Sequence, residues 1–214
     1  MLGELRVGVK MFVVTVDQVQ SRTHDDLVAR AVREVTAKHG ETLVLPAERT
    51  AGDEFQVAVD DAAVVLDIVL GLTRAAWWSV GVGVGGVRHP LPASTREATG
   101  DAYYAARTAV DRAKKAPTRF ALQTGADEGE AADLARDCEA LIDLLLSLRE
   151  RRTDGGWEIA DLLAGGMSQK QAAEALGITA SAASLRIKAA GIRLEERSVV
   201  ALRRLLERLG TLAA

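Results

Sequence analysis

Two kinds of hydrophobic periodicity alternate through residues 11–123, and this alternation constrains the fold more than any other feature of the chain. Short β-branched or alternating runs, which are typical of strands, occur at 11–16, 42–48, 54–60, 77–87 and 119–123. Between them, apolar residues at three- and four-residue spacing predict helices over 24–40, 61–76 and 100–115. The predicted order is β-α-β-β-α-β-α-β, which indicates an α+β domain.

The first part of this order is the split βαβ pattern of ferredoxin-like folds. In that arrangement the first strand lies beside the hairpin formed by the second and third. Asp17 follows the first strand and Asp53 lies at the hairpin tip, so both carboxylates are expected at one end of the sheet. Two carboxylates, completed by phosphate oxygens, suit Mg²⁺ or Mn²⁺. Aspartate is also common in turns, so two ordinary turn residues are the alternative.

Three motifs carry a resemblance to known families. The hairpin "RTAGDEFQVAV" (49–59) resembles the metal-binding hairpin of class III nucleotidyl cyclases and the GGDEF signature of diguanylate cyclases, with Ala51 replacing the first glycine. "VDQVQSR" (16–22) and "GDAYYAARTAVDRAKK" (100–115) resemble the bacterial SatD family. The resemblance implies a palm-like nucleotide-binding domain over 1–123, with Asp17 and Asp53 as ligands of Mg²⁺ or Mn²⁺. It also implies that Glu54 is the catalytic acid if the domain is active.

Several other residues are candidates for contacting a nucleotide. The resemblance maps Lys114 onto a lysine that contacts the triphosphate, and it places Arg49 where adenylate-forming cyclases read the base with lysine. Near Asp17, a loop hydroxyl and guanidinium are suited to phosphate oxygens, although a solvated loop start is equally consistent with them. The candidate nucleotide-binding residues are Ser21, Arg22, Arg49, Gly52, Arg107 and Lys114.

The chain departs from the cyclase pattern where the base is read. The helix after Asp17 lacks the Asn-Asp pair that reads guanine in diguanylate cyclases, and Tyr103 stands four residues before Arg107, where the cyclase helix has asparagine. Phosphate and metal binding are therefore better supported than base identity or cyclisation. One of the two tyrosines at 103–104 and at least one of the two tryptophans at 77–78 are expected in the core.

Residues 124–152 are predicted to form a linker and a dimerisation helix. The segment 124–133 is small and polar, and an apolar stripe follows at alternating four- and three-residue spacing, as in a coiled coil. Its members are Leu134, Cys138, Leu141, Leu145 and Leu148. Because the stripe covers barely two heptads, a helix that packs within its own chain is the alternative. A homodimer is nevertheless expected, since two-fold DNA readers gain from a second half-site.

Residues 153–214 are predicted to be a DNA-binding domain. "SQKQAAEALGITASAASLRIKAAG" (168–191) resembles the helix-turn-helix of many bacterial regulators, with Gly177 at the tight turn. Short polar residues at the start of the second helix suit base edges, and basic residues suit phosphates of double-stranded DNA. The candidate DNA-binding residues are Thr179, Ser181, Ser184, Arg186, Lys188 and Arg193. A helical protein-interaction module is the alternative.

Charge and cysteine content narrow the functional class. The net charge of -3 gives no general argument for nucleic acid, but from Arg149 onward 11 basic residues stand against 8 acidic ones. A mildly basic tail on an acidic body suggests two functions. The single cysteine, Cys138, excludes an intrachain disulfide and favours a reducing cytoplasm. No apolar run reaches the roughly 18 residues that a membrane span requires, so no membrane partner is expected.

Three functions are compatible with these features. The first is a transcription regulator whose palm-like domain binds a nucleotide and whose tail binds DNA. The second is an active nucleotidyl cyclase or nucleotidyltransferase, and the third is a degenerate palm that serves as a dimer scaffold. The pairing of the two domains favours the first, and the presence of both acids and Glu54 supports the second.

Overall fold

The computed structural model describes residues 10–21 and 23–213, which divide into two compact units. Of these described residues, those up to 143 and from 202 onward form the first unit, and residues 144–201 form the second. The boundary falls inside two long helices, α4 (Glu130–Glu150) and α8 (Ile192–Leu212). The segments 124–143 and 202–214 therefore belong with the first unit, whereas the sequence-based domain boundaries were placed near 123 and 153.

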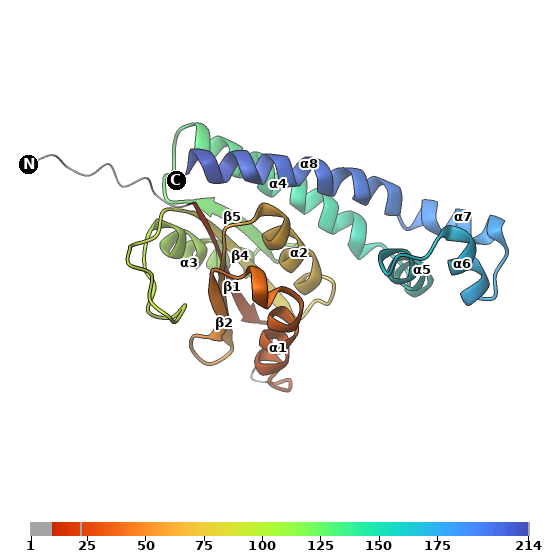
Figure 1. Ribbon diagram of the computed structural model, residues 1–214, viewed down its shortest axis with the longest axis horizontal. Coiled ribbons are helices and arrows are strands. Elements are labelled where there is room, and N and C mark those ends of the chain that lie inside the picture. The colour runs from red at the N-terminus through yellow and green to blue at the C-terminus, as the bar shows by residue number, and fades with distance from the viewer. Residues whose placement is uncertain (1–9, 22, 214) are drawn as a thin grey trace, which may run out of the picture. The chain divides into compact units, whose positions relative to one another are not determined.

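The first unit is built on a mixed sheet (Figure 1), which has five strands in the order β2-β3-β1-β4-β5. β1 (Met11–Gln18) pairs antiparallel with both β3 (Glu54–Val59) and β4 (Trp78–Gly85). β2 (Leu45–Arg49) forms the hairpin with β3, and β5 (Phe120–Thr124) runs parallel to β4. The predicted α+β class is confirmed, as is the pairing of the first strand with the hairpin.

Three helices connect these strands. α1 (Val28–His39), which ends in a short 3₁₀ turn at Gly40–Thr42, and α2 (Ala62–Leu72) follow β1 and β3, and α3 (Asp101–Ala113) joins β4 to β5. The helical pattern begins at residue 24, but α1 begins only at Val28, and side chains bind the amide of Val28 and that of Leu27, which precedes the helix. Leu27 N donates to Gln18 Oε1 at 2.9 Å, and Val28 N donates to Asp26 Oδ1 at 3.0 Å.

α3 packs unusually close to β4 because the strand carries glycines under it. A Cβ at Gly81 would lie 2.1 Å from Val110 N, and one at Gly83 would lie 2.0 Å from Ala102 O. Both distances are far below van der Waals contact, so the helix lies where only glycine allows it. The alternating glycines of this strand leave space for a close neighbour or a ligand, and at Gly81 and Gly83 that space is taken by α3. The spacing fixes the height of α3, and hence of Arg107 and Lys114, above the sheet.

The second unit contains three short helices packed around alanine and isoleucine side chains. They are α5 (Asp154–Ala164), α6 (Gln169–Ala175) and α7 (Ala180–Ala189), and their shared core includes Ile159, Ala173, Ala183 and Ile187. Ser168 caps α6 in a reciprocal capping box, Gly177 adopts a φ of 63°, and Thr179 caps α7. Two helices joined by a left-handed glycine turn therefore stand where the sequence predicts them.

The apolar stripe of α4 is divided between the interior and the surface. The helix begins at Glu130, inside the predicted linker. Cys138 and Leu145 are buried within their own chain, Leu134 and Leu148 are half-buried, and Leu141 is exposed. The stripe thus largely follows the alternative interpretation, and the large apolar side chains of the helix that are exposed are Leu141 and Leu144. Over the described residues, no helix combines the length and apolar character needed to cross a bilayer.

Candidate functional site

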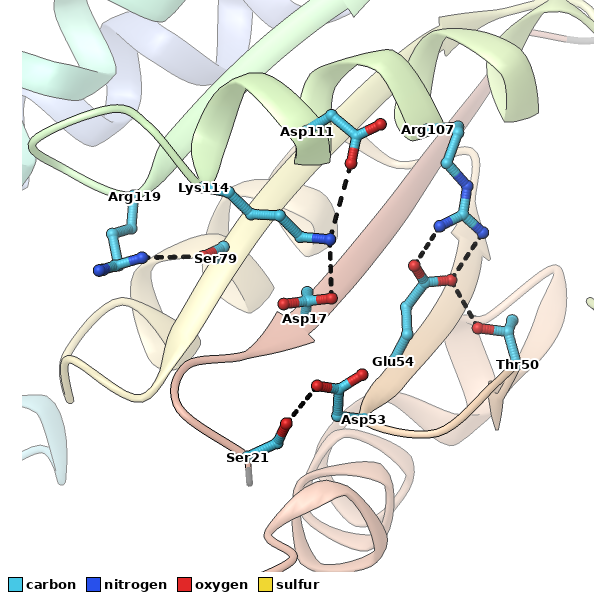
Figure 2. Close-up of polar contacts among 10 residues, drawn as sticks. All are labelled: Asp17, Ser21, Thr50, Asp53, Glu54, Ser79, Arg107, Asp111, Lys114 and Arg119. Carbon is cyan, nitrogen blue, oxygen red and sulfur yellow. Dashed lines mark hydrogen bonds and ion pairs between the residues drawn. The ribbon is translucent and has the colours of Figure 1, made fainter. Parts of the chain in front are cut away.

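The end of β1 and the β2–β3 turn bring the predicted acidic residues together. Asp17 is the register partner of Glu54 on one side and of Ser79 on the other, so these side chains share one face of the sheet. Asp53 directly precedes β3, and its carbonyl accepts a hydrogen bond of 3.0 Å from Gln18 N. Figure 2 shows Asp17 and Asp53 at the same end of the sheet, below α3. The structure therefore brings the two proposed metal ligands together.

Two basic side chains, those of Arg107 and Lys114, extend from α3 toward this face of the sheet (Figure 2). Lys114, which follows the last turn of α3, places Nζ 2.9 Å from Asp17 Oδ2 and 3.6 Å from Asp111 Oδ1. Arg107 forms a bidentate ion pair with Glu54, in which Nη2 lies 2.8 Å from Oε1. The α3 side of the site thus supplies one cation to each of two carboxylates.

Glu54 is the most enclosed of the acids. Its side chain is only 6% exposed, and Oε1 also accepts a hydrogen bond of 2.6 Å from Thr50 Oγ1. Both carboxylate oxygens are therefore bound, by Arg107 and by Thr50. Such a bidentate, charge-assisted contact fixes α3 relative to the hairpin. The geometry favours a positioning role for Glu54 over one in proton transfer.

The hairpin turn presents Asp53 to the loop that follows β1. Gly52 has a φ of 56°, a conformation in which glycine carries no steric penalty, and the turn closes with a 3.0 Å bond from Glu54 N to Ala51 O. Ser21 Oγ donates a hydrogen bond to Asp53 Oδ2. Gly52 therefore acts through backbone geometry, whereas Ser21 places a hydroxyl directly beside the acidic pair.

The site carries more negative than positive charge near Asp17. Burial raises the pKa of Asp17, the hydrogen bond and charge of Lys114 oppose that rise, and the charges of Asp53 and Glu54 add to it. For Lys114, burial alone would lower the pKa, but the contact with Asp17 and the charges of Asp111 and Glu54 together outweigh burial, so the pKa is raised. Lys114 thus stays protonated without fully compensating Asp17. A further cation would stabilise the ionised form of Asp17.

The donor set suits a metal that is shared with a ligand. Among residues 10–21 and 23–213, no group of three or more His, Cys, Asp and Glu side chains is arranged to hold a metal ion. Asp17 and Asp53 remain as a pair, since Arg107 and Thr50 occupy Glu54. Mg²⁺ is commonly held by one or two carboxylates, with waters and substrate phosphates completing its shell. The residues present therefore fit Mg²⁺ or Mn²⁺ bound together with a phosphate ligand.

Other predicted nucleotide contacts lie differently. Arg22 falls outside the described residues. Arg49 forms two hydrogen bonds with the carboxylate of Asp26, in the loop before α1, so its guanidinium is bound to protein. Tyr103 is buried, its hydroxyl has no hydrogen-bond partner in the described part of the chain, and burial raises its pKa to about 12. Tyr104, by contrast, is exposed.

Sequence reasoning missed Ser79 and Arg119. Arg119 lies just before β5 with a φ of 53°, and its Nη1 donates to Ser79 Oγ at 3.4 Å. Because Ser79 is the register partner of Asp17, the guanidinium of Arg119 lies at the same end of the sheet as Lys114 (Figure 2). The alternation of side chains along β1 and β4 could have predicted that Ser79 lies on this face of the sheet. Arg119 is the first residue of the last predicted strand, 119–123, and a basic residue at that strand start was the signal for it.

On α7, the predicted DNA contacts fall into distinct environments. Ser181, Ser184 and Lys188 are exposed, and so is Leu185, which the sequence pattern did not single out. Thr179 uses its hydroxyl to cap α7, where it accepts from Ala182 N at 3.1 Å. The outward face of α7 therefore carries two serines, one leucine and one lysine.

The two predicted arginines near α7 are paired with acids. Arg186 Nη1 lies 3.8 Å from Glu158 Oε2 on α5, and Arg193 Nη1 lies 3.0 Å from Glu196 Oε2 on α8. Each guanidinium is at least partly neutralised by its neighbour. Their contribution to phosphate binding would require these exposed pairs to open.

The basic excess of the tail is not concentrated around α7. Arg203, Arg204 and Arg208 belong to the first unit. Arg149 and Arg152 pair with Glu195 and stack on Trp157, with their guanidinium carbons 4.9 and 4.4 Å from its ring centroid. The charge argument for DNA binding is therefore weaker than the sequence indicated. The argument from the α6–α7 turn geometry is unaffected.

Comparison with known proteins adds no family assignment, because neither a protein-family model nor a curated protein matches the chain. The functional argument therefore rests on the residues and on their geometry.

Proposed function

We propose that the first unit binds a nucleotide together with Mg²⁺ or Mn²⁺, and that the chain is a transcription regulator whose second unit binds DNA. The observation that carries the proposal is the convergence of Asp17, Asp53 and Lys114 at one end of the sheet. Two carboxylates supply oxygen ligands for a hard cation, and the lysine supplies a positive charge for phosphate. The strand order β2-β3-β1-β4 is also the order expected for a palm-like, split βαβ domain.

The residues of the site have separable roles in this proposal. Asp17 and Asp53 would hold the metal, which supplies positive charge against the phosphate oxygens when it is bound. Lys114, which lies beside Asp17, would contact the phosphates, and Ser21 offers its hydroxyl beside Asp53. Arg107 keeps Glu54 and α3 in place. The positions of these side chains at one end of the sheet support each role.

Binding is favoured over turnover by the state of Glu54. Arg107 and Thr50 together donate three hydrogen bonds to Glu54, so three of about four acceptor positions of its carboxylate are taken. We therefore rank a nucleotide sensor above an active nucleotidyl cyclase. Chromatography of ATP or GTP after incubation with the protein and Mn²⁺ separates the two, since a new product would establish turnover.

The nucleotide site is tested by comparing two aspartates that flank β3. Asp53 directly precedes the strand and Asp60 directly follows it at the opposite end of the sheet. Asp53→Asn should weaken the binding of ATP or GTP with Mg²⁺ at least tenfold in calorimetric titration of the full chain. Asp60→Asn should bind as the wild type does. Equal affinities of the two variants and the wild type would show that Asp53 holds no metal.

The DNA-binding half is tested independently on the full chain. Affinity for duplex DNA should fall steeply with salt, because phosphate contacts release counterions. Lys188→Ala removes a charge from the outward face of α7, whereas Arg204→Ala removes one from an exposed position of α8 in the first unit. Only the first change should weaken binding in a gel shift with selected duplexes. A protein that binds no duplex at low salt, with or without nucleotide, is not a DNA-binding regulator.

A further inference from the structure

Two adjacent tryptophans at the start of β4 have opposite environments. Trp78 is 7% exposed and packs edge-to-face on Phe55, with ring centroids 5.7 Å apart. Trp77 is 42% exposed. Its carbonyl accepts a 2.8 Å hydrogen bond from Val19 N, which fixes it beside the chain that leaves β1. A large aromatic surface is therefore held at the protein surface instead of in the core.

The loop between β1 and α1 connects Trp77 to the acidic pair. Ser21 of this loop binds Asp53, and the ring of His24 lies 5.0 Å from that of Trp77 at an interplanar angle of 75°. The two loop residues are three positions apart, so they are separated by at most about 10 Å even in an extended chain. One short loop thus contacts both the carboxylate of Asp53 and the exposed indole of Trp77.

The strand register also places Trp77 at the end of the sheet that carries the carboxylates, independently of the loop. Trp77 lies two residues before Ser79, and Ser79 is the register partner of Asp17. The indole therefore belongs to the strand end that adjoins the carboxylates. Tyr104, the other exposed aromatic residue near the site, lies on α3 one turn before Arg107.

We propose that Trp77 is the stacking surface for the base of the bound nucleotide. This inference rests on the proposed function and adds the class of ligand, which is a nucleoside polyphosphate. Its base would stack on the indole, and its phosphates would bind the metal and Lys114. Stacking on an aromatic ring is available to every base, because each has a π-face. Trp77 can therefore contribute to the affinity for a nucleotide even though the chain lacks a pair of polar side chains that selects one base.

The test compares a ligand that has a base with one that has none. Full-length protein with Mg²⁺ is titrated calorimetrically with ATP and, separately, with inorganic tripolyphosphate. Trp77→Ala should weaken ATP binding about tenfold, equivalent to about 1.4 kcal/mol, and leave tripolyphosphate binding unchanged. Trp77→Phe keeps an aromatic face and should retain most of the ATP affinity. Tyr104→Ala, the matched change on α3, should leave both ligands unaffected.

Each contrary result has a distinct meaning. Equal ATP affinity in Trp77→Ala and the wild type overturns the inference, and so does a parallel loss of ATP and tripolyphosphate, which would mark a structural effect. A wild type that prefers tripolyphosphate to ATP, or a loss of ATP affinity in Tyr104→Ala alone, also overturns it. If the wild type binds neither ligand, the metal–nucleotide site itself is refuted, which is a separate failure.

Discussion

Replacing Gly83 by alanine should displace α3 and disturb the candidate site from a distance. The new Cβ would lie 2.0 Å from Ala102 O and 2.2 Å from Ala106 N, both of which are backbone atoms of α3. Because ordinary contact begins near 3.4 Å, the helix must retreat by about 1.4 Å. A shift of that size would lengthen the 2.9 Å contact between Lys114 and Asp17 beyond ion-pair distance.

The expected effects are measurable in stability and in binding. Overpacking of this kind costs about 1–3 kcal/mol, which lowers the melting temperature by roughly 2–4 °C per kcal/mol in a chain of this size. Affinity for a nucleotide with Mg²⁺ should fall as well, because Arg107 and Lys114 move with the helix. Thermal denaturation and calorimetric titration measure the two effects.

Gly86→Ala is the matched control, because Gly86 lies just beyond the end of the same strand and no described atom lies within 4 Å of the position that its new Cβ would take. This variant should change neither the melting temperature nor the nucleotide affinity. If Gly83→Ala behaves as Gly86→Ala does, then α3 is not held against β4 by the absence of a side chain. The argument that glycine spacing positions Arg107 and Lys114 would then be incorrect.

Two further predictions concern pH and assembly. Burial lowers the pKa of His39, an effect that Asp67 only partly offsets. The unfolded chain therefore binds more protons below about pH 6.5, so stability should fall as the pH decreases through that range. In urea denaturation at pH 7.5, 6 and 5, His39→Gln should lose less stability than the wild type, and an identical pH dependence would refute the assignment. The predicted homodimer should use the exposed leucines of α4 as its interface. The double variant Leu141→Asp, Leu144→Asp should therefore sediment as a folded monomer. A wild type that is itself monomeric at micromolar concentration would contradict this.

The sequence predicted the strands and the meeting of the two acids because both depend on local pattern and on element order. Alternating β-branched residues mark the strands, and a hairpin beside β1 necessarily brings Asp53 toward Asp17. The start of α1 was placed too early, because the amide of Leu27 at its true start is bound by Gln18, which belongs to β1. Such a contact is not visible as periodicity.

Charge partners were the least predictable part of the site. The sequence shows that Arg49 and Asp26 are charged, but only the fold shows that they face each other across 23 residues. The same holds for Arg186, whose direction depends on α5 and Glu158. Surface charges have many possible partners of similar energy, so spacing along the chain does not select one.

The two ion pairs beneath α3 differ in a way that suits ligand exchange. Arg107 binds the carboxylate of Glu54 through two parallel hydrogen bonds, and that carboxylate is nearly inaccessible to water. Lys114 makes a single contact with Asp17, whose carboxylate is more exposed than that of Glu54. A lysine is a mobile point charge, whereas a bidentate arginine is held in a fixed geometry. In the proposed function, Asp17 would hold the divalent cation and the ammonium group of Lys114 would be free to contact the phosphates, while the Arg107 pair keeps α3 in place.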